Sequence, residues 1–269
     1  MGTSLVDAGV AHPAGIPNVL ICLLGRFHVL KRGHAMSMRA GGRTQSLLAV
    51  LALGSRSIGI ARDDLLEQLW PGSDEGLAVQ SLRTLVYSLH RSLGDVLGGA
   101  GPVVHLDGRY RLNGEAGVVV DVDRFDSAVD SAERSSKRGE TRDALDHYQD
   151  AVDIYAGDLV GGTNIQYLLE RERLRTRYLS ARAQIGEHHL AQGEYLEALR
   201  GATDILAHDP FREDAHRMAM RCYVRLGQRA QALRQYRICR DALAREFEPP
   251  PEPATETLHE LVRFDPARV

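Results

Sequence analysis

A short pattern recurs along the chain at a spacing that few folds produce. A glycine is followed five residues later by an Ala-Leu pair at Gly193, and again at Gly227, 34 residues further on. A third copy begins at Gly139, 54 residues before Gly193, so about 20 residues are inserted after the first copy. A period of 34 residues is typical of stacked pairs of antiparallel helices. The second half of the chain is therefore expected to be helical, and such hairpins more often bind partners than catalyse reactions.

The composition fits a chain of two globular domains. Of the 269 residues, 43% are hydrophobic and 26% are charged, which is enough for one large core or two ordinary ones. The three cysteines form no CxxC pair, which favours a reducing cytoplasm over a disulfide framework. No run approaches the ~18 apolar residues needed to span a bilayer, so no membrane association is expected. Residues 1–17 lack the features of a signal peptide and are predicted to be a disordered lead-in.

The charge is distributed unevenly along the chain. The net charge is −3, but residues 18–115 contain 11 Arg and Lys against 8 Asp and Glu. From residue 116 onward the balance reverses, with 22 basic residues against 27 acidic ones. The basic excess of the first part is small, but its sign is the one that contact with nucleic acid requires.

Short strands and then helices are predicted for the first part of the chain. Apolar runs at 19–24 and 27–30, with a shorter one at 35–38, suggest a small antiparallel sheet. The apolar periodicity then predicts one helix over residues 43–53 and a second that begins near residue 62 and stops at Trp70 and Pro71.

A third helix is predicted over residues 77–93, with two different sides. Its apolar residues form one narrow stripe that faces the core, namely Leu82, Val86, Leu89 and Leu93. The opposite side carries hydrogen-bond donors, an aromatic ring and guanidinium groups without an acid: Gln80, Arg83, Thr84, Tyr87, Ser88 and Arg91. Such a side suits the major groove of DNA, although any exposed helix face is polar, and this helix alone does not decide between the two interpretations.

A two-residue hairpin follows the third helix. Asp107-Gly108 readily takes the positive backbone angles of a type I′ turn, which fixes the register of residues 103–106 against 109–112. Directly paired residues share a face, so Tyr110 is expected to pack inward with the leucine at position 112.

The same register predicts that Arg109 and Arg111 point outward from the hairpin. Three helices followed by a hairpin with outward arginines describe a winged helix-turn-helix. In that motif the last helix reads bases and the wing grips phosphates.

An ordered set of landmarks runs from residue 20 to about residue 262. They are Leu24-Gly25, Arg62-Asp63-Asp64-Leu65, Leu69-Trp70, the apolar stripe of the third helix, Gly108-Arg109-Tyr110-Arg111-Leu112, Asp121-Val122-Asp123-Arg124-Phe125, Glu172-Arg173-Leu174 and the closing segment 249–261. In order and spacing this set resembles the Streptomyces antibiotic regulatory proteins. That family joins a winged helix of the OmpR and PhoB type to an all-helical bacterial transcriptional activation domain.

The resemblance implies partners as well as a fold. The implied partners are double-stranded promoter DNA, RNA polymerase holoenzyme and a second copy of the chain, which would form a homodimer on direct repeats. Candidate phosphate contacts, beside the exposed side of the third helix, are Arg43, Arg62, Arg109 and Arg111. The chain carries Ser88 and His90 where members of the family often carry arginine.

Other constellations do not suggest an enzyme or a metal protein. His188-His189 and the cysteines lack the spacing of a zinc site. Asp121, two residues before a second aspartate, is interpreted as a cap for a helix that starts near Arg124. No nucleophile, base and orienting group can be assembled, so no catalytic residue, no metal and no cofactor are expected.

The sequence thus predicts a mostly α protein. After the lead-in at 1–17, we expect a winged helix-turn-helix with a small β-sheet and wing hairpin at 18–114, then an all-α tetratricopeptide-like activation domain at 119–264. The predicted function is a cytoplasmic, nucleoid-associated transcriptional activator, pathway-specific for secondary-metabolite (antibiotic) genes. The alternative is a protein-interaction adaptor whose winged helix has lost DNA binding and whose helical hairpins carry the function.

Overall fold

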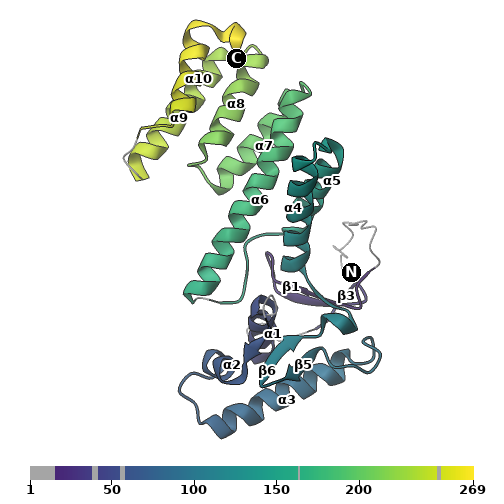
Figure 1. Cartoon of the computed structure of the whole chain (residues 1–269). Helices are drawn as coiled ribbons and strands as arrows, with labels where there is room; N and C mark the ends of the chain where they lie inside the picture. Colours follow the sequence, from purple (N-terminus) through teal and green to yellow (C-terminus); the bar gives the residue numbers. More distant parts are fainter. Residues whose placement is uncertain (1–15, 38–41, 55–57, 163, 247–249) are drawn as a thin grey trace, which may run out of the picture. The chain divides into compact units, whose positions relative to one another are not determined.

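The computed structural model describes residues 16–37, 42–54, 58–162, 164–246 and 250–269 (Figure 1). The lead-in expected at residues 1–17 lies almost entirely outside these residues, as does Met38 at the end of the third predicted strand. The chain divides into two compact units. The first contains the residues up to 127 together with 153–174, and the second contains 128–152 and 175–269.

The first unit combines short strands with helices. In chain order its elements are β1 (Val19–Cys22), β2 (His28–Lys31), β3 (His34–Ala35), α1 (Arg43–Gly54), β4 (Ile60–Ala61), α2 (Arg62–Leu69), α3 (Glu75–Leu93), β5 (Val103–Leu106), β6 (Arg109–Leu112) and β7 (Val118–Val120), with a short 3-10 turn at Gly114–Ala116. The boundaries between the units pass through α4 (Asp121–Lys137), α5 (Thr141–Ile154) and α6 (Ile165–Ala191).

The second unit is helical throughout its described residues. Its further elements are α7 (Tyr195–His208), α8 (Glu213–Arg225), α9 (Arg229–Glu246), α10 (Pro253–Phe264) and a 3-10 turn at Pro266–Arg268. The predicted fold, a mostly α chain with small sheets before an all-helical part, is confirmed.

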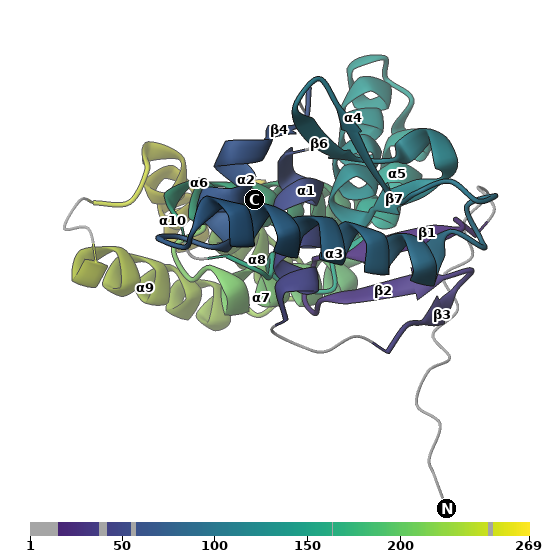
Figure 2. The same ribbon diagram turned by 90° about the horizontal axis from the view of Figure 1, so that it is seen from below.

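Each sheet of the first unit includes one strand that the sequence pattern does not predict. β1, β2 and β3 are antiparallel neighbours as expected (Figure 2), but β7 lies parallel to β1 on its other side and places Val118 opposite Val19. In the second sheet, of order β4-β6-β5, the added strand is β4. Both added strands are very short and pair with strands far away in the sequence, so no local pattern marks them.

Helices α1, α2 and α3 supply leucines to the core of the first unit. Those with at most 1% of their surface exposed are Leu47, Leu48, Leu51, Leu65, Leu69, Leu82 and Leu93. α1 is packed against α2, α3 and β6, and for this reason its apolar residues extend around much of its circumference.

The residues inserted into the repeat return to the first sheet. The N–H of Val160 donates to the carbonyl of Leu23 (2.9 Å), and the N–H of Gly25 donates to the carbonyl of Asp158 (3.0 Å). The two backbones can approach closely because Gly157 has no side chain. A Cβ at this position would lie only 2.9 Å from the Cα of Gly25. The insertion is therefore a structural part of the first unit, and not a longer link between two hairpins.

The recurring glycine of the 34-residue pattern ends the first helix of each hairpin. Gly139, Gly193 and Gly227 follow α4, α6 and α8, and their φ angles are 76°, 79° and 73°. After each glycine the next N–H donates to a carbonyl five residues back, as in a Schellman motif. The alanine of the pattern is at most 4% exposed in the following helix, where its small side chain allows close helix packing. The helical hairpins expected from the repeat are confirmed.

Asp121 has a different role from the predicted one. It does not cap a helix starting near Arg124, because α4 begins at Asp121 itself. Its Oδ2 accepts the N–H groups of Leu23 (2.8 Å) and Leu24 (2.9 Å), and its Oδ1 accepts that of Val122 (2.8 Å). Burial raises the pKa of this carboxyl to about 6, against the opposing effect of the three donors. The side chain thereby joins the end of β1 to the start of α4.

Helix α10 closes the second unit by packing on α8 and α9. Its buried residues Leu258 and Val262 contact Met220, Ala232 and Tyr236. Burying an apolar side of the last hairpin in this way is the task of a terminal capping helix in repeat proteins. In the described parts of the chain, no helix is both long and apolar enough to cross a lipid bilayer.

Candidate nucleic-acid interface

Both ends of α3 carry a charge that complements the helix dipole. At the N-terminus the carboxylate of Asp74 accepts the N–H of Leu77 (3.0 Å). At the C-terminus the ammonium group of Lys31 donates to the carbonyl of Ser92 (3.0 Å) and pairs with Asp95 (2.8 Å). An anion at the first turn and a cation at the last one both stabilise a helix. Lys31 of β2 thus holds the C-terminus of the helix, and the neighbouring Asp74 caps its N-terminus.

The two sides of α3 differ as predicted. Ala78, Leu82, Leu89 and Leu93 are at most 4% exposed, while Val86 is half-buried. All six residues predicted for the DNA-facing side are exposed, namely Gln80, Arg83, Thr84, Tyr87, Ser88 and Arg91.

Within the exposed side, the aromatic ring is the most prominent group. Tyr87 has 65% of its surface exposed. The hydroxyl of Thr84 donates to the carbonyl of Gln80 (2.9 Å), which leaves its methyl group and an acceptor lone pair for a ligand. A helix side with these groups can make both apolar contacts to thymine methyls and hydrogen bonds to base edges.

The wing hairpin has the predicted register. His105 lies opposite Tyr110, and the φ angles of Asp107 and Gly108 are 50° and 72°, both positive as a type I′ turn requires. Tyr110 and Leu112 are 8% and 6% exposed, so their inward packing is confirmed. The ring of His105 stacks on that of Tyr110 with 4.2 Å between centroids, which stiffens the hairpin.

The wing arginines have intramolecular partners that the hairpin register does not predict. Arg109 donates from Nη1 to the carbonyl of Gly59 (2.8 Å) and lines a cavity of about 710 Å³ that α1, α2 and the start of α6 enclose. Nη2 of Arg111 pairs with Glu115 at 3.3 Å. The register places both side chains on the face opposite Tyr110, as predicted, but both are half-buried. Their partners lie outside the hairpin, so pairing within it says nothing about them.

Arg62 and Arg43 begin α2 and α1. The N–H of Arg62 donates to the carbonyl of Gly108 (3.0 Å), which places the start of α2 beside the wing turn. The guanidinium of Arg62 is paired with two carboxylates, and the nearer is Asp63 at 3.0 Å. Arg43 lies over the ring of Trp70, 5.9 Å from its centroid. Each of these two arginines therefore has a partner within the first unit.

Arg83 and Arg91 differ in this respect from the other arginines of the predicted site. Among the described residues, neither side chain is paired with an acid or engaged in a hydrogen bond. An unpaired guanidinium can bind a phosphate without giving up a carboxylate partner. The most available cations of the candidate interface are therefore on α3.

A hollow of about 350 Å³ lies beside the C-terminal half of α3, next to Tyr87 and Arg91. His90, which the sequence pattern leaves out of the site, lines it, and the ring Nε2 of His90 lies 3.0 Å from the carbonyl oxygen of Gly99. This contact holds the loop after α3 against the helix. No sequence signal indicates it, because the partner is a backbone atom in a glycine-rich loop.

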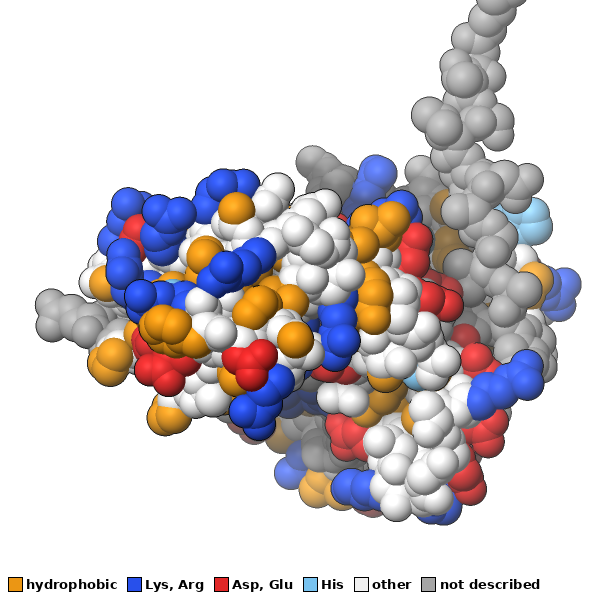
Figure 3. Space-filling model, turned by 90° about the horizontal axis from the view of Figure 1, so that it is seen from above, with side chains coloured by type: hydrophobic (Ala, Val, Ile, Leu, Met, Phe, Trp, Pro, Cys, Tyr) orange, Lys and Arg blue, Asp and Glu red, His pale blue; other side chains and the backbone are white. Residues whose placement is uncertain are grey.

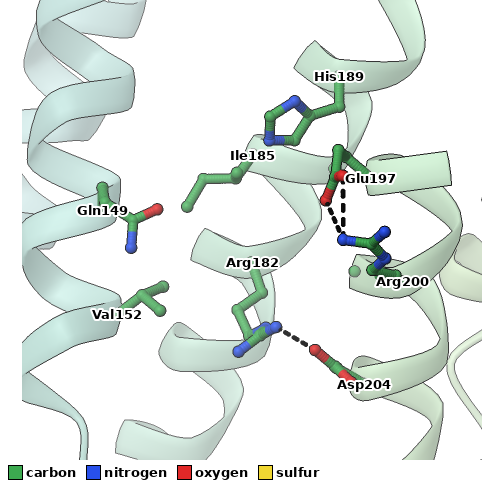
Figure 4. A pocket seen from close by; sticks show the side chains of 10 residues that line it. Gln149, Val152, Arg182, Ile185, His189, Glu197, Arg200 and Asp204 are labelled. Carbon is green, nitrogen blue, oxygen red and sulfur yellow. Dashed lines mark hydrogen bonds and ion pairs between the residues drawn. The ribbon is translucent and has the colours of Figure 1, made fainter. Parts of the chain in front are cut away.

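The second unit has a polar hollow of its own, of about 290 Å³, between α5, α6 and α7 (Figure 4). Arg182 pairs with Asp204 (2.6 Å), and Arg200 pairs with Glu197 (3.0 Å). Gln149 faces these pairs from α5. Because both guanidinium groups already have carboxylate partners, this hollow has no excess charge with which to select an ion.

Metal-binding chemistry is not apparent among the residues that the structure describes. No three His, Cys, Asp or Glu side chains there lie together as metal ligands would. The three cysteines are buried, and burial raises the pKa of the Cys22, Cys222 and Cys239 thiols to about 12, 11 and 12. Such thiols are poorly reactive at neutral pH.

The helical part of the chain matches a known domain. The model of the bacterial transcriptional activator domain matches residues 120–263, which is more than half of the chain. The matched span includes all three copies of the repeat signature and the insertion between the first two.

Several regulators are similar to this chain in sequence. The regulatory protein AfsR of Streptomyces coelicolor is 28% identical over 228 residues, which is 83% of this chain and 22% of AfsR. The transcriptional regulatory protein MoaR1 of Mycobacterium tuberculosis is 24% identical over 260 residues, 95% of this chain and 83% of MoaR1. The regulatory protein DnrI of Streptomyces peucetius is 25% identical over 236 residues, 83% of this chain and 85% of DnrI.

One solved structure shares the fold along nearly the whole chain. It is that of Mycobacterium tuberculosis EmbR in complex with a low-affinity phosphopeptide, with a TM-score of 0.73 and 19% identity. The match covers 92% of this chain and 65% of the EmbR chain. The chain thus spans about a fifth of AfsR and somewhat less than two thirds of EmbR.

The matched domain, the similar regulators and the shared fold agree on one class of protein. They confirm the resemblance that the ordered landmarks carry. The chain belongs to the bacterial transcriptional activator domain family, and in sequence it is similar to regulators of the Streptomyces antibiotic regulatory protein type.

Proposed function

We propose that this activator binds promoter DNA through α3 and the wing, as two copies on direct repeats, and recruits RNA polymerase to genes of a secondary-metabolite (antibiotic) pathway. It acts in the cytoplasm, at the nucleoid, and needs neither a cofactor nor a catalytic site. Residues 18–114 bind DNA, and residues 119–264 contact the second copy and the polymerase. The observation that carries the proposal is the exposed side of α3, which has an exposed tyrosine, no acid, and two arginines that are not paired with an acid among the described residues.

The six exposed side chains predicted for the DNA-facing side of α3 contact the base edges and the nearest phosphates. Arg83 and Arg91 take phosphate or guanine contacts, because they have no carboxylate partner among the described residues. Tyr87, Thr84, Gln80 and Ser88 supply the apolar contacts and hydrogen bonds. The start of α2 and the wing turn, which the Arg62 N–H joins to Gly108, grip the neighbouring phosphates.

The structure favours different strengths for the phosphate contacts. Arg62 and Arg111 exchange an existing carboxylate partner for a phosphate, so each contributes less to affinity than an unpaired arginine. Arg109 acts mainly by bracing the wing against Gly59. To contact a phosphate, Arg43 would have to give up its cation-π contact with the ring of Trp70.

A mobility-shift titration tests the DNA assignment. The probe is DNA from the region upstream of the protein's own gene, titrated at several salt concentrations. Arg83→Ala and Arg91→Ala should each weaken binding, and each lost phosphate contact should reduce the slope of log affinity against log salt by about 0.9. Arg109→Ala should also weaken binding, whereas Arg111→Ala should have a smaller effect than either α3 variant.

Arg142→Ala is the matched control, because Arg142 is an exposed arginine of α5. It should bind like the wild type. If both α3 variants bind DNA with wild-type affinity, α3 is not the DNA interface. No protection of DNA by the wild-type protein would favour the adaptor function. Footprinting with and without RNA polymerase then tests recruitment, which predicts an extended footprint only when both proteins are present.

A further inference from the structure

The exposed side of α9 is basic, although the second half of the chain is acidic. Arg234, Arg237 and Arg245 lie in a narrow arc opposite the buried residues of the helix. Among the described residues none of the three is paired with an acid. Asp241 shares the arc, but Arg240 at 2.9 Å offsets its charge. We call the first three residues the basic stripe. Figure 3 shows one face of the molecule, on which Lys and Arg side chains gather at the left with a few Asp and Glu side chains among them.

An apolar side chain lies at the edge of the basic stripe, beside Arg234 and Arg245 on the helix surface. Ile238 has 57% of its surface exposed and lies one residue after Arg237. Arginines around an apolar residue are typical of protein interfaces. A DNA backbone offers no apolar partner, so this surface favours an acidic protein surface over a second DNA contact.

The exposed side of α5 has the opposite charge. Asp143, Asp146 and Asp150 lie along one side of the helix, and the buried Ala144, Tyr148 and Ala151 lie along the other. These three aspartates form the acidic stripe, in which Asp143 and Asp146 are exposed. Asp150 is half-buried, with His147 at 3.9 Å.

The two stripes match each other in spacing. Arg234 and Arg237 are three residues apart on α9, as Asp143 and Asp146 are on α5. In both helices this spacing corresponds to a rise of about 4.5 Å along one side. Two ion pairs can therefore form together when the helices lie alongside each other. Arg234, Arg237, Asp143 and Asp146 are exposed within one copy of the chain, so these four side chains are available to another copy.

We propose that the basic stripe of one copy docks on the acidic stripe of a second copy. Two different surfaces meet, so the contact is head to tail and suits two copies that face the same way on direct repeats. The setting on DNA rests on the proposed function. Exposed ion pairs are weak and screened by salt, so the contact forms mainly where DNA holds two copies close together.

Position-specific cross-linking tests this contact without DNA. Ile238→Cys in one preparation and His147→Cys in another place a thiol beside each stripe and keep every arginine and aspartate of both. The native cysteines are buried and do not compete. Under mild oxidation at about 20 mM salt, the mixed 147 to 238 disulfide should form about tenfold faster than either like pair, and about 0.5 M salt should remove the difference.

Charge removal supplies the decisive comparison. Arg234→Ala with Arg237→Ala in the first preparation, or Asp143→Asn with Asp146→Asn in the second, should lower the mixed rate to that of the like pairs. Arg225→Ala, which removes an exposed arginine of α8 outside the stripe, should leave it unchanged. Equal rates for mixed and like pairs, or a mixed rate that ignores charge removal, would overturn the contact.

The same variants separate this inference from the proposed function. On DNA with a single repeat, the stripe variants should bind like the wild type. Weaker binding there by the arginine variants would assign the basic stripe to DNA and overturn the contact between copies. Loss of DNA binding by the α3 variants bears on the proposed function alone.

Discussion

At the scale of single residues, buried polar groups hold the elements of this protein together. Asp121 is the clearest case, because its carboxylate accepts N–H groups from Leu23, Leu24 and Val122 while only 6% exposed. Water does not reach these donors, so another residue would have to satisfy them if Asp121 were lost. A charge in such a place makes stability depend on pH.

The unfolding free energy should carry a pH dependence that Asp121 causes. Its pKa is raised from 3.8 to about 6 in the folded chain, so folding favours the protonated form. The resulting stability is fully present below pH 3.8 and is lost as the pH rises through about 6. The difference amounts to about 3 kcal/mol. Urea titrations of wild type and Asp121→Asn should show their difference in unfolding free energy change by this amount between about pH 4 and 6.5.

Ser136→Ala serves as the control for this experiment, because it changes an exposed side chain of the same helix that does not titrate. Its difference from the wild type should stay nearly constant over the same pH range. A pH-independent difference for Asp121→Asn would show that the buried carboxyl does not titrate in this window.

At the scale of elements, α10 is held by polar contacts at its start and by apolar packing along its length. Both carboxylate oxygens of Glu213 accept the N–H of Glu252 (3.1 and 2.9 Å), and one also accepts the hydroxyl of Thr255 (2.6 Å). Arg217 donates to that hydroxyl oxygen (2.8 Å) and to the carboxylate of Glu252 (2.7 Å). A residue of α8 thus caps the N-terminus of α10, where negative charge is favourable.

Thr255→Val should loosen α10 without changing the size of the side chain. Thr255 is fully buried, so the change leaves Glu213 and Arg217 each short of one partner and should cost about 1–3 kcal/mol. Hydrogen exchange of the α10 amides should accelerate accordingly. Thr257→Val is the matched control, because its exposed hydroxyl bonds only to the carbonyl of Pro253 in the same helix (2.8 Å). Equal exchange in the two variants would contradict this role of Thr255.

At the scale of the whole molecule, the first unit extends beyond the stretch 18–114 that the sequence predicts for the winged helix. β7 lies parallel to β1 and extends its sheet. Just after β1, Leu23 donates its N–H to the carboxylate of Asp121 and accepts the N–H of Val160 at its carbonyl. The helical repeat is interrupted at the segment that makes this last contact. The insertion in the 34-residue period therefore contributes to the first unit, while the regular hairpins build the second.

A fragment of residues 18–114 should be less stable than one of residues 18–127. The shorter fragment lacks β7 and Asp121, so the N–H groups of Leu23 and Leu24 lose a charged acceptor, at a cost of about 3 kcal/mol or more. Thermal unfolding of the two fragments, followed by circular dichroism, measures the difference. Equal midpoints would mean that the winged helix is complete without β7.

Much of the fold follows from local patterns. The glycine that recurs with the repeat predicts each hairpin because a left-handed residue ends the preceding helix, as Gly193 does with φ of 79°. Asp107-Gly108 predicts the wing register because a two-residue turn leaves only one pairing. The apolar stripe of α3 predicts its exposed side because the helical period relates the two.

The partners of individual side chains could not be predicted in this way. Arg109 and Arg111 were predicted to point away from Tyr110, and the hairpin register could not predict that Gly59 and Glu115 approach them from outside the hairpin. His90 carries no signal of its own, since Gly99 reaches it through a loop. Each of these contacts depends on where a second segment runs in space.

The sequence by itself determined the order and type of the elements, the hairpin register and the side of α3 that faces solvent, because short-range periodicity and turn chemistry specify them. Only the tertiary structure decided that β7 completes the first sheet, that the insertion pairs with the segment after β1, and that Asp121 joins β1 to α4. It also decided which arginines lack a carboxylate partner among the described residues. Those features are contacts between residues far apart in the chain, and the packing of the whole core sets them.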